Sequence, residues 1–325
     1  MRSCVAGDRR RENAEAEHAR REPLMRAGIE LGKWLLVSIL VSGAGLLVGC
    51  GGATNENTSD GRLTLGYVGW DESVAISNLT KVLLEEELGY VEVELRKRSP
   101  ESVFRGVGSG ELDAFQDVWL PHHKPLLEEA GGDVGLLLPW LVGTTRSSLA
   151  VPDYMGIRTV EQLGSIGEPR IVGLEPEAAP MGEIPYGAVV EPPPEGSYYP
   201  STAGMLAEAD RLYEAREPFV FVAWSPHWMN LRYDFEYLED PEGVLGDVTQ
   251  PARPYTVVRE DLAQEEPVAR ALMDTLEFTD YRISSLELEI QDAKSPEKGA
   301  RSWIQEHEKF TESWVETTEE RAGLE

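Results

Sequence analysis

The stretch that decides the fold begins with Leu63-Thr64-Leu65-Gly66-Tyr67-Val68 and ends with Asp113-Ala114-Phe115-Gln116-Asp117-Val118. The first of these runs is short and apolar, which predicts a buried strand. Residues 75–88 carry apolar side chains at helical spacing, and residues 91–95 alternate as a second strand does. Ser99-Pro100-Glu101-Ser102 predicts a helix start, because serine caps helices well and proline suits the first helical position. Residues 113–118 predict a third strand.

This alternation predicts an α/β protein with a parallel sheet that is covered by helices on both faces. A second unit of sheet and helices is expected, with strands at residues 148–152, 170–174 and 218–223. The segment from residue 251 onward is predicted to be mostly helical and to pack on the first unit. We therefore expect one lobe of residues 62–145 plus 251–325 and another of residues 146–250.

The amino-terminal region has the pattern of an export signal. Arg26 and Lys33 precede an uncharged stretch that ends in Leu47-Val48-Gly49-Cys50. A basic segment, a short apolar segment and small residues before the cleavage point are typical of signal peptides, and the stretch is shorter than the about 20 apolar residues that span a bilayer. We predict a signal peptide over residues 1–49, with Met25 as a possible true start. A membrane-anchor helix is the alternative.

The ending Leu47-Val48-Gly49-Cys50 resembles a bacterial lipobox. This resemblance implies that Cys50 becomes a diacylated first residue, and that residues 50–61 form a flexible tether. The protein is then expected on the extracytoplasmic side of the cell membrane, held by a lipid anchor. Cys4 is the only other cysteine, so the mature chain is expected to contain no disulfide, and it is long enough to bury a core without one.

The net charge of −28 limits the classes of partner. It argues against nucleic acid and against electrostatic adhesion to anionic lipid. It suits a cationic ligand at long range, but general surface acidity is the preferred explanation of the charge. The sequence contains no Gly-x-Ser-x-Gly, His-Glu-x-x-His or phosphate-binding glycine loop, and His122-His123 has no further clustered ligands. We predict no enzyme activity, no cofactor and no metal; a surface-anchored, carboxylate-dependent hydrolase is the alternative from another class.

Trp70, Trp119 and Trp224 each follow a predicted strand. Ligands of open α/β sheets bind at the carboxyl ends of the strands, so these rings are expected on the binding face. A quaternary ammonium ion has no N–H to donate, and aromatic faces attract it by ~0.5–2 kcal/mol each. The three tryptophans therefore predict a site for such a cation, with a role in the hydrophobic core as the alternative.

Three motifs resemble the substrate-binding proteins of glycine betaine/choline ABC transporters. They are Gly66-Tyr67-Val68-Gly69-Trp70, Asp117-Val118-Trp119-Leu120-Pro121 and Trp224-Ser225-Pro226-His227-Trp228-Met229, and the run from Tyr233 to Pro241 is similar too. The resemblance extends over about residues 62–285. It implies a two-lobed fold of the type II periplasmic-binding-protein kind, with the ligand cleft between the lobes. It also implies an ABC permease and ATPase as partners, and a role in osmoprotection.

The resemblance also implies an aromatic box, formed here by Trp70, Trp119 and Trp224. Relatives often add a fourth ring where this chain has Arg146-Ser147-Ser148, so Tyr198, Tyr199 or Trp140 are the candidates for that wall. A cation between Trp70 and Trp119 of one lobe and Trp224 of the other is expected to hold the lobes closed.

Charged residues near the box bear on the choice of ligand. Asp71 and Glu72 follow Trp70, and an acidic residue faces the ligand in choline-binding relatives; a charged loop tip is the alternative. His227 is the candidate donor for a betaine carboxylate, unless it is bonded to nearby backbone. Glycine betaine is the first expectation. Because Glu175 and Glu177 would repel a carboxylate, choline or another cation stays open. A choline or carnitine binder of the same fold is the alternative.

Overall fold

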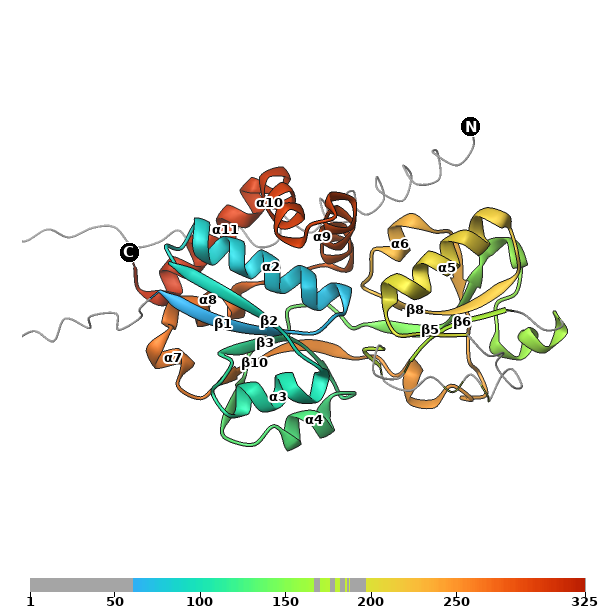
Figure 1. Cartoon of the computed structure of the whole chain (residues 1–325), viewed down its shortest axis with the longest axis horizontal. Helices are drawn as coiled ribbons and strands as arrows, with labels where there is room; N and C mark the ends of the chain where they lie inside the picture. The colour runs from blue at the N-terminus through green and yellow to red at the C-terminus, as the bar shows by residue number, and fades with distance from the viewer. Residues whose placement is uncertain are drawn as a thin grey trace, which may run out of the picture. The chain divides into compact units, whose positions relative to one another are not determined.

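The computed structural model describes residues 61–324, except residues 167–169, 176–178, 182–184, 186 and 188–196. The predicted signal peptide, Met25, Cys50 and residues 50–60 of the tether lie outside the described residues. The rest of the chain forms two mixed sheets with helices packed on them (Figure 1). The predicted two-lobed α/β fold is confirmed, while the exact lobe boundaries stay a prediction.

The first sheet has the strand order β2-β1-β3-β10-β4. Its members are β1 (Arg62–Tyr67), β2 (Glu92–Lys97), β3 (Ala114–Leu120), β4 (Val134–Leu136) and β10 (Arg253–Arg259). β1 runs parallel to β2 and β3, as predicted. β10 runs antiparallel between β3 and β4, so the prediction of an all-parallel sheet is wrong. β10 also shows that the segment after residue 251 starts with a strand. Its alternation is interrupted by Pro254, and its pairing partner lies over 130 residues earlier in the sequence.

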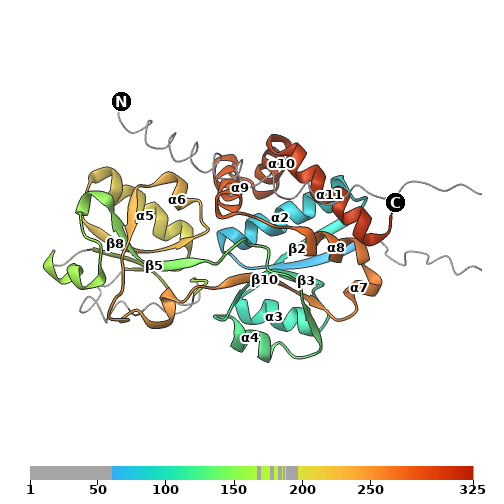
Figure 2. The same ribbon diagram turned by 180° about the vertical axis from the view of Figure 1, so that it is seen from behind.

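Two groups of helices cover the first sheet (Figures 1 and 2). One side carries α3 (Pro100–Gly108) and α4 (Lys124–Glu129). The other side carries α2 (Asp71–Glu86) and the carboxy-terminal helices α8 (Pro267–Thr275), α9 (Asp280–Ala293), α10 (Pro296–Glu306) and α11 (Glu308–Ala322), with the short α7 (Leu262–Glu265) before them. The predicted packing of the carboxy-terminal segment on the first unit is therefore observed.

The second sheet has the order β7-β6-β8-β5-β9. It consists of β5 (Arg146–Pro152), β6 (Arg170–Leu174), β7 (Tyr198–Tyr199), β8 (Phe219–Ser225) and β9 (Phe235–Tyr237). β6 pairs in parallel with β7 and β8, whereas β5 is antiparallel to β8 and β9. Helix α5 (Thr202–Ala215) packs on this sheet, and the short α6 (Met229–Arg232) follows β8.

The chain passes between the two sheets twice, after β4 and again before β10. The two crossing segments are bonded to each other, because the backbone N–H of Thr145 donates to Ala252 O at 2.8 Å. The N–H of Ala252 donates in return to Thr145 Oγ1 at 3.0 Å. This paired connection is the place where any movement of one lobe against the other has to bend the chain.

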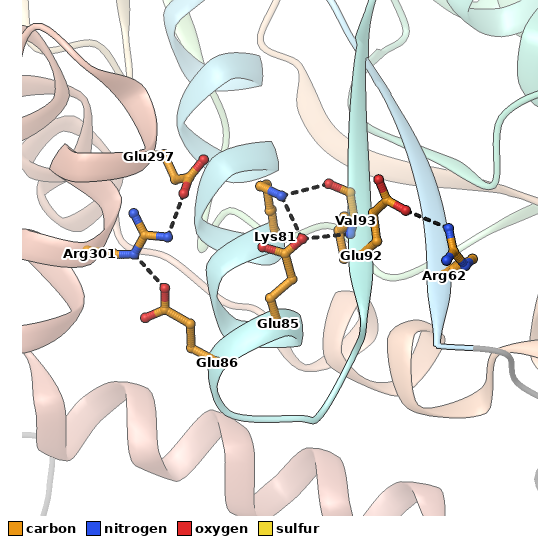
Figure 3. A network of polar contacts seen from close by, with 8 residues as sticks. All are labelled: Arg62, Lys81, Glu85, Glu86, Glu92, Val93, Glu297 and Arg301. Atoms are coloured by element: carbon orange, nitrogen blue, oxygen red, sulfur yellow. Dashed lines mark hydrogen bonds and ion pairs between the residues drawn. The ribbon is translucent and has the colours of Figure 1, made fainter.

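Polar contacts on both sides of α2 fix the orientation of this helix (Figure 3). Lys81 contacts Glu85 at 2.6 Å and donates to Val93 O of β2 at 2.9 Å, and Glu85 accepts from the Val93 N–H at 2.7 Å. Arg301 of α10 reaches Glu86 on the opposite side of the helix. The Arg301–Glu86 pair is exposed, and an exposed pair adds little stability by itself. These contacts matter because they hold α2 in place, and the first turn of α2 carries the acidic residues of the site described next.

Candidate ligand-binding site

Trp70 and the two acidic residues after it are placed by the start of α2. Trp70 is the N-cap residue, and its carbonyl accepts from the N–H of Val74 at 3.0 Å. Asp71 and Glu72 form the first turn, where a negative charge is favoured by the helix dipole. The side chain of Glu72 is 0% exposed. The alternative that these residues form a charged loop tip is therefore wrong.

Trp119 and Trp224 lie within the last residues of β3 and β8, slightly earlier than predicted. Both side chains are fully buried. Trp119 comes from the first sheet, yet it packs in the same hydrophobic cluster as Trp224 and the strands of the second sheet. Trp70 lies in a neighbouring cluster with Val118 of β3. The three predicted box residues thus gather where the two lobes meet.

The indole N–H groups of two of these tryptophans are held by carboxylates. Trp119 Nε1 donates to Asp117 Oδ1 at 2.7 Å, and Trp224 Nε1 donates to Glu72 Oε1. The second contact joins α2 of the first lobe to β8 of the second. Each bond fixes the direction of its ring and places a carboxyl group at the ring edge. Among the described residues, no two of the three indoles form a ring–ring contact with each other.

His123 backs the ring of Trp70, and sequence analysis assigned it no role. The two rings stack with centroids 5.2 Å apart and an interplanar angle of 23°. His123 Nδ1 accepts from the Trp119 N–H at 2.9 Å, so Nε2 carries the hydrogen and donates to Pro180 O at 2.9 Å. Burial lowers the pKa of His123 to about 4, which keeps the ring neutral. The proximity of His122-His123 to Trp119 was the only sequence signal.

Three carboxylates at the site are buried and only half satisfied. Glu72, Asp117 and Glu287 each use one oxygen, Glu287 by accepting the Trp228 N–H at 2.9 Å. Their second oxygens, Glu72 Oε2, Asp117 Oδ2 and Glu287 Oε1, have no hydrogen-bond partner in the described part of the chain. A buried carboxylate without a partner is costly to ionise. The region where the lobes meet therefore contains three buried carboxylate oxygens whose hydrogen-bonding capacity is unused among the described residues.

The pKa values of these three groups are raised. Burial is the main cause for Glu72, whose pKa stands well above its ordinary value, and the charges of Asp117 and Asp71 raise it further. Burial and then the charges of Glu72 and Asp71 raise the pKa of Glu287. Burial raises the pKa of Asp117 to about 7. A positive ligand would reverse these shifts, because an opposite charge favours the ionised form.

Asp71 has the opposite electrostatic state. Its Oδ1 accepts from Trp228 Nε1 at 3.1 Å and from Gln291 Nε2 at 2.7 Å, and its Oδ2 lies 3.2 Å from His227 Nε2. Burial by itself would raise the pKa of Asp71, but the contacts with His227, Trp228 and Gln291 outweigh it and lower the pKa. Asp71 is therefore an ionised, fully engaged carboxylate.

His227 is fully buried and faces Asp71. Its Nδ1 accepts from the Met229 N–H at 3.1 Å, which leaves the hydrogen on Nε2 and directs it at the Asp71 carboxylate. The alternative of a bond to nearby backbone is therefore observed on one ring nitrogen. The role of His227 as a donor to a ligand carboxylate stays a prediction.

The candidates for a fourth wall have different surroundings. Trp140 is a core residue, because its Nε1 donates to Gln116 O and its ring contacts Phe278 edge-on at 6.0 Å. Tyr198 is 40% exposed on β7. Arg146, which stands where relatives often carry a ring, lies over the ring of Tyr237 at 4.2 Å.

Two further sequence expectations concern charges and metals. Glu175 is exposed, and Glu177 lies outside the described residues. In the described part of the chain, no three His, Cys, Asp or Glu side chains are grouped so that they could hold a metal ion. None of the helices described is long and apolar enough to cross a membrane.

The chain is similar to proteins that bind quaternary ammonium compounds. It is 30% identical over 123 residues to the glycine betaine/carnitine transport binding protein of Listeria monocytogenes, covering 38% of this chain and 40% of that protein's length. The crystal structure of the lactococcal protein OpuAC with glycine betaine is 29% identical, with a TM-score of 0.62, covering 78% of this chain and 99% of that one. A choline-binding protein solved with choline shares the fold, with 24% identity, a TM-score of 0.65, and 79% of this chain and 92% of that one covered.

Residues 61–306 match the family described as the substrate-binding domain of ABC-type glycine betaine transport systems. These residues contain both sheets and every acidic and aromatic residue of the site. Members of this family are transporter substrate-binding proteins, which are not enzymes. This chain belongs to the family of substrate-binding domains of ABC-type glycine betaine transport systems.

Proposed function

We propose that this protein captures a quaternary-ammonium solute outside the cytoplasmic membrane and delivers it to an ABC permease and ATPase, making and breaking no bond. The observation that supports this most is the meeting of Trp70, Trp119 and Trp224 beside buried carboxylates at the junction of the lobes. Aromatic faces bind a cation that has no N–H to donate. Uptake of such a solute would serve osmoprotection.

The half-satisfied carboxylates favour a ligand with a net positive charge. Glu72 Oε2 and Asp117 Oδ2 are buried without partners, and a choline-type ligand offers them a cation and a hydroxyl donor. Glycine betaine would bring its own carboxylate to a site that already holds several. Choline is therefore the ligand that the geometry supports best, in place of the glycine betaine that the sequence favoured.

Glycine betaine is the second candidate because of His227. The Nε2 of this buried ring lies 3.2 Å from Asp71 Oδ2, and a ligand carboxylate that displaced Asp71 would accept its hydrogen. Carnitine combines a hydroxyl with a carboxylate. Its hydroxyl would donate to the buried carboxylates, and its carboxylate would accept from His227.

Closure of the two lobes on the ligand follows from the contacts between them. Glu72 of α2 bonds Trp224, and Glu287 of α9 bonds the Trp228 backbone across the same junction. A ligand that touches Trp119 and Trp224 together selects the arrangement in which these contacts form. The closed protein is then the form that the permease recognises.

Calorimetric titration with choline, glycine betaine, proline betaine, carnitine and ectoine tests the proposal. We expect saturable binding of at least one trimethylammonium compound, with choline tightest, and no binding of ectoine above background. Recovery of the ligand unchanged after incubation separates a binding protein from a hydrolase. Absence of binding by all quaternary compounds would contradict the proposal, as would turnover of any of them.

The lipid anchor is the second part of the proposal. Cys50 in its lipobox-like segment is expected to carry the lipid, and residues 50–61 to tether the domain to the membrane. Cys50→Ala should move the protein from the membrane fraction to the soluble extracytoplasmic fraction. Retention of this variant in the membrane would favour a spanning segment instead.

A further inference from the structure

A cavity that none of the three tryptophans lines lies among the carboxy-terminal helices of the first lobe. It has a volume of about 460 Å³. Pro139 from the first crossing segment, Arg253 at the start of β10, and Arg282, Phe310 and Arg321 from α9 and α11 line it. Figure 2 shows α8, α9, α11 and β10, which supply most of these residues. Three arginines thus face one cavity in a chain of 58 acidic and 30 basic residues.

Arg282 is a partly buried cation without a counter-charge. Its guanidinium carbon lies 3.6 Å above the centre of the Phe310 ring. Burial lowers the pKa of Arg282, and no anionic neighbour offsets this effect. Within the described residues its side chain forms no hydrogen bond or ion pair, which is unusual because a desolvated guanidinium is normally matched by an acceptor.

Arg253 differs from Arg282 in being exposed to solvent at the edge of the cavity, whereas Arg321 is engaged. The side chain of Arg253 also has no hydrogen bond or ion pair within the described part of the chain. Arg321 Nη1 donates to Asp274 O at 3.1 Å and lies 3.6 Å from Asp274 Oδ2. The cavity therefore has two cations without partners from two different elements, β10 and α9.

The acidic residues of the cavity do not neutralise these two arginines. Asp274 contacts Arg321, and its Oδ1 accepts from the Leu138 N–H at 3.2 Å. Glu277 is exposed, and it forms no ion pair with either arginine. The charge at the cavity is thus positive, because Arg253 and Arg282 are not neutralised there. The whole protein, in contrast, has a net negative charge.

We propose that this cavity binds a small oxyanion, a carboxylate or a sulfate-like group, through Arg253 and Arg282. The guanidinium fork matches the two oxygens of a carboxylate or of sulfate, and charge-assisted bonds of this kind are about twice as strong as neutral ones. Phe310 holds the Arg282 guanidinium over its ring, and the N–H groups of this guanidinium form no hydrogen bond within the described residues. Two sources supply this chemistry: a free anion, or a carboxylate side chain of the transporter.

Titration of the whole mature protein with sodium sulfate and with sodium acetate tests the free-anion source. Ionic strength is held constant with sodium chloride, and binding is followed by calorimetry and by the melting temperature. We expect saturable binding that Arg282→Gln weakens by about tenfold, since the variant loses charge-assisted hydrogen bonds to the anion. Arg253→Gln should weaken it by a similar factor, and Arg158→Gln, an exposed arginine of the second lobe, should leave it unchanged.

Arg282→Lys distinguishes a loss of anion recognition from a loss of folding. It keeps the positive charge but removes the forked pair of N–H donors. Its anion affinity should lie between those of the native protein and Arg282→Gln, while all variants keep their affinity for the quaternary ammonium ligand. Anion binding that survives both Arg282→Gln and Arg253→Gln would place the anion elsewhere and overturn the proposal.

The reconstituted ABC transporter tests the partner source. If the carboxylate belongs to the transporter, Arg282→Gln and Arg253→Gln should lower the stimulation of ATP hydrolysis by the loaded binding protein, with no free anion bound. If the free anion is the occupant, stimulation should follow anion concentration. The proposal fails if neither anion binding nor stimulation changes in these variants.

Discussion

Asp71 and Glu72 are adjacent in the first turn of α2, yet they have opposite electrostatic states. Asp71 contacts His227, Trp228 and Gln291, and its pKa is lowered. Glu72 accepts from Trp224 Nε1 and from its own backbone, and its pKa is raised by burial and by the charge on Asp117. Both oxygens of Asp71 have partners within the protein, whereas Glu72 Oε2 has no hydrogen-bond partner among the described residues. Under the proposed function, Asp71 holds the lobes together and Glu72 receives the cation.

The difference has a structural origin. Residues one apart on a helix point about 100° apart, so Asp71 and Glu72 face different elements of the second lobe. Asp71 is directed toward the start of α6 and toward α9, where the side chains of His227, Trp228 and Gln291 supply hydrogen-bond donors. Glu72 is directed toward β8 and shares its surroundings with Asp117 of β3, another acid. We refer to Asp71, His227, Trp228 and Gln291 as the clasp, and to Glu72 and Asp117 as the carboxylate pair.

The largest expected effect comes from removing a ring beside the carboxylate pair. Trp119→Ala should weaken the binding of choline by at least about tenfold, because it removes a cation–π face and leaves Asp117 without its indole donor. Trp119→Phe should retain part of the affinity. Trp140→Phe is the matched control, since Trp140 is a core tryptophan, and calorimetry should find its affinity unchanged. Equal losses of choline affinity in the Trp119 and Trp140 variants would contradict the aromatic-box hypothesis.

The next effect separates charge from shape in the carboxylate pair. Glu72→Gln keeps an oxygen for Trp224 Nε1 but loses the negative charge, so it should weaken choline by about fivefold to tenfold. Glycine betaine, which has no net charge, should lose less. The exposed Glu175→Gln controls for the overall change in charge and should change neither affinity. Equal losses for the two ligands would show that Glu72 acts only by positioning Trp224.

A smaller effect is expected in the clasp. Asp71→Asn weakens its contact with His227 and should lower the affinity of every ligand by about threefold to fivefold, because the closed arrangement is less stable. Choline and glycine betaine should be affected alike, as measured by calorimetry at one pH. A selective gain in betaine affinity would instead reveal that Asp71 competes with the ligand for His227 Nε2.

The smallest effect is a dependence of stability on pH. Asp117 binds its proton more tightly in the folded protein than in the unfolded chain, with its pKa raised to about 7. The folded state thus holds more protons between the unfolded value near 4 and about 7, so stability should fall as pH rises through this window. The melting temperature without ligand should show this slope, and Asp117→Asn should flatten it. Added choline should flatten it too, and a slope unchanged in Asp117→Asn would assign it to another group.

The sequence by itself determined the local elements and the aromatic residues. Apolar runs such as residues 63–68 and 170–174 are observed as β1 and β6. A short buried strand can be predicted locally because its own run of apolar side chains marks it in the sequence. The serine–proline helix start is also observed, with Ser99 as the N-cap of α3. The strand-end tryptophans and the family were recognised for the same reason, since motifs are contiguous in the chain.

Only the tertiary structure decided how these elements meet. The place of β10 in the first sheet depends on pairing with β3 across a long sequence separation, which no local pattern encodes. The roles of His123, Glu287 and Gln291 were missed because their partners come from other elements. The contrast between Asp71 and Glu72 arises in the same way. Two acids that are alike in sequence acquire different pKa values because burial and neighbouring charges are properties of the folded chain.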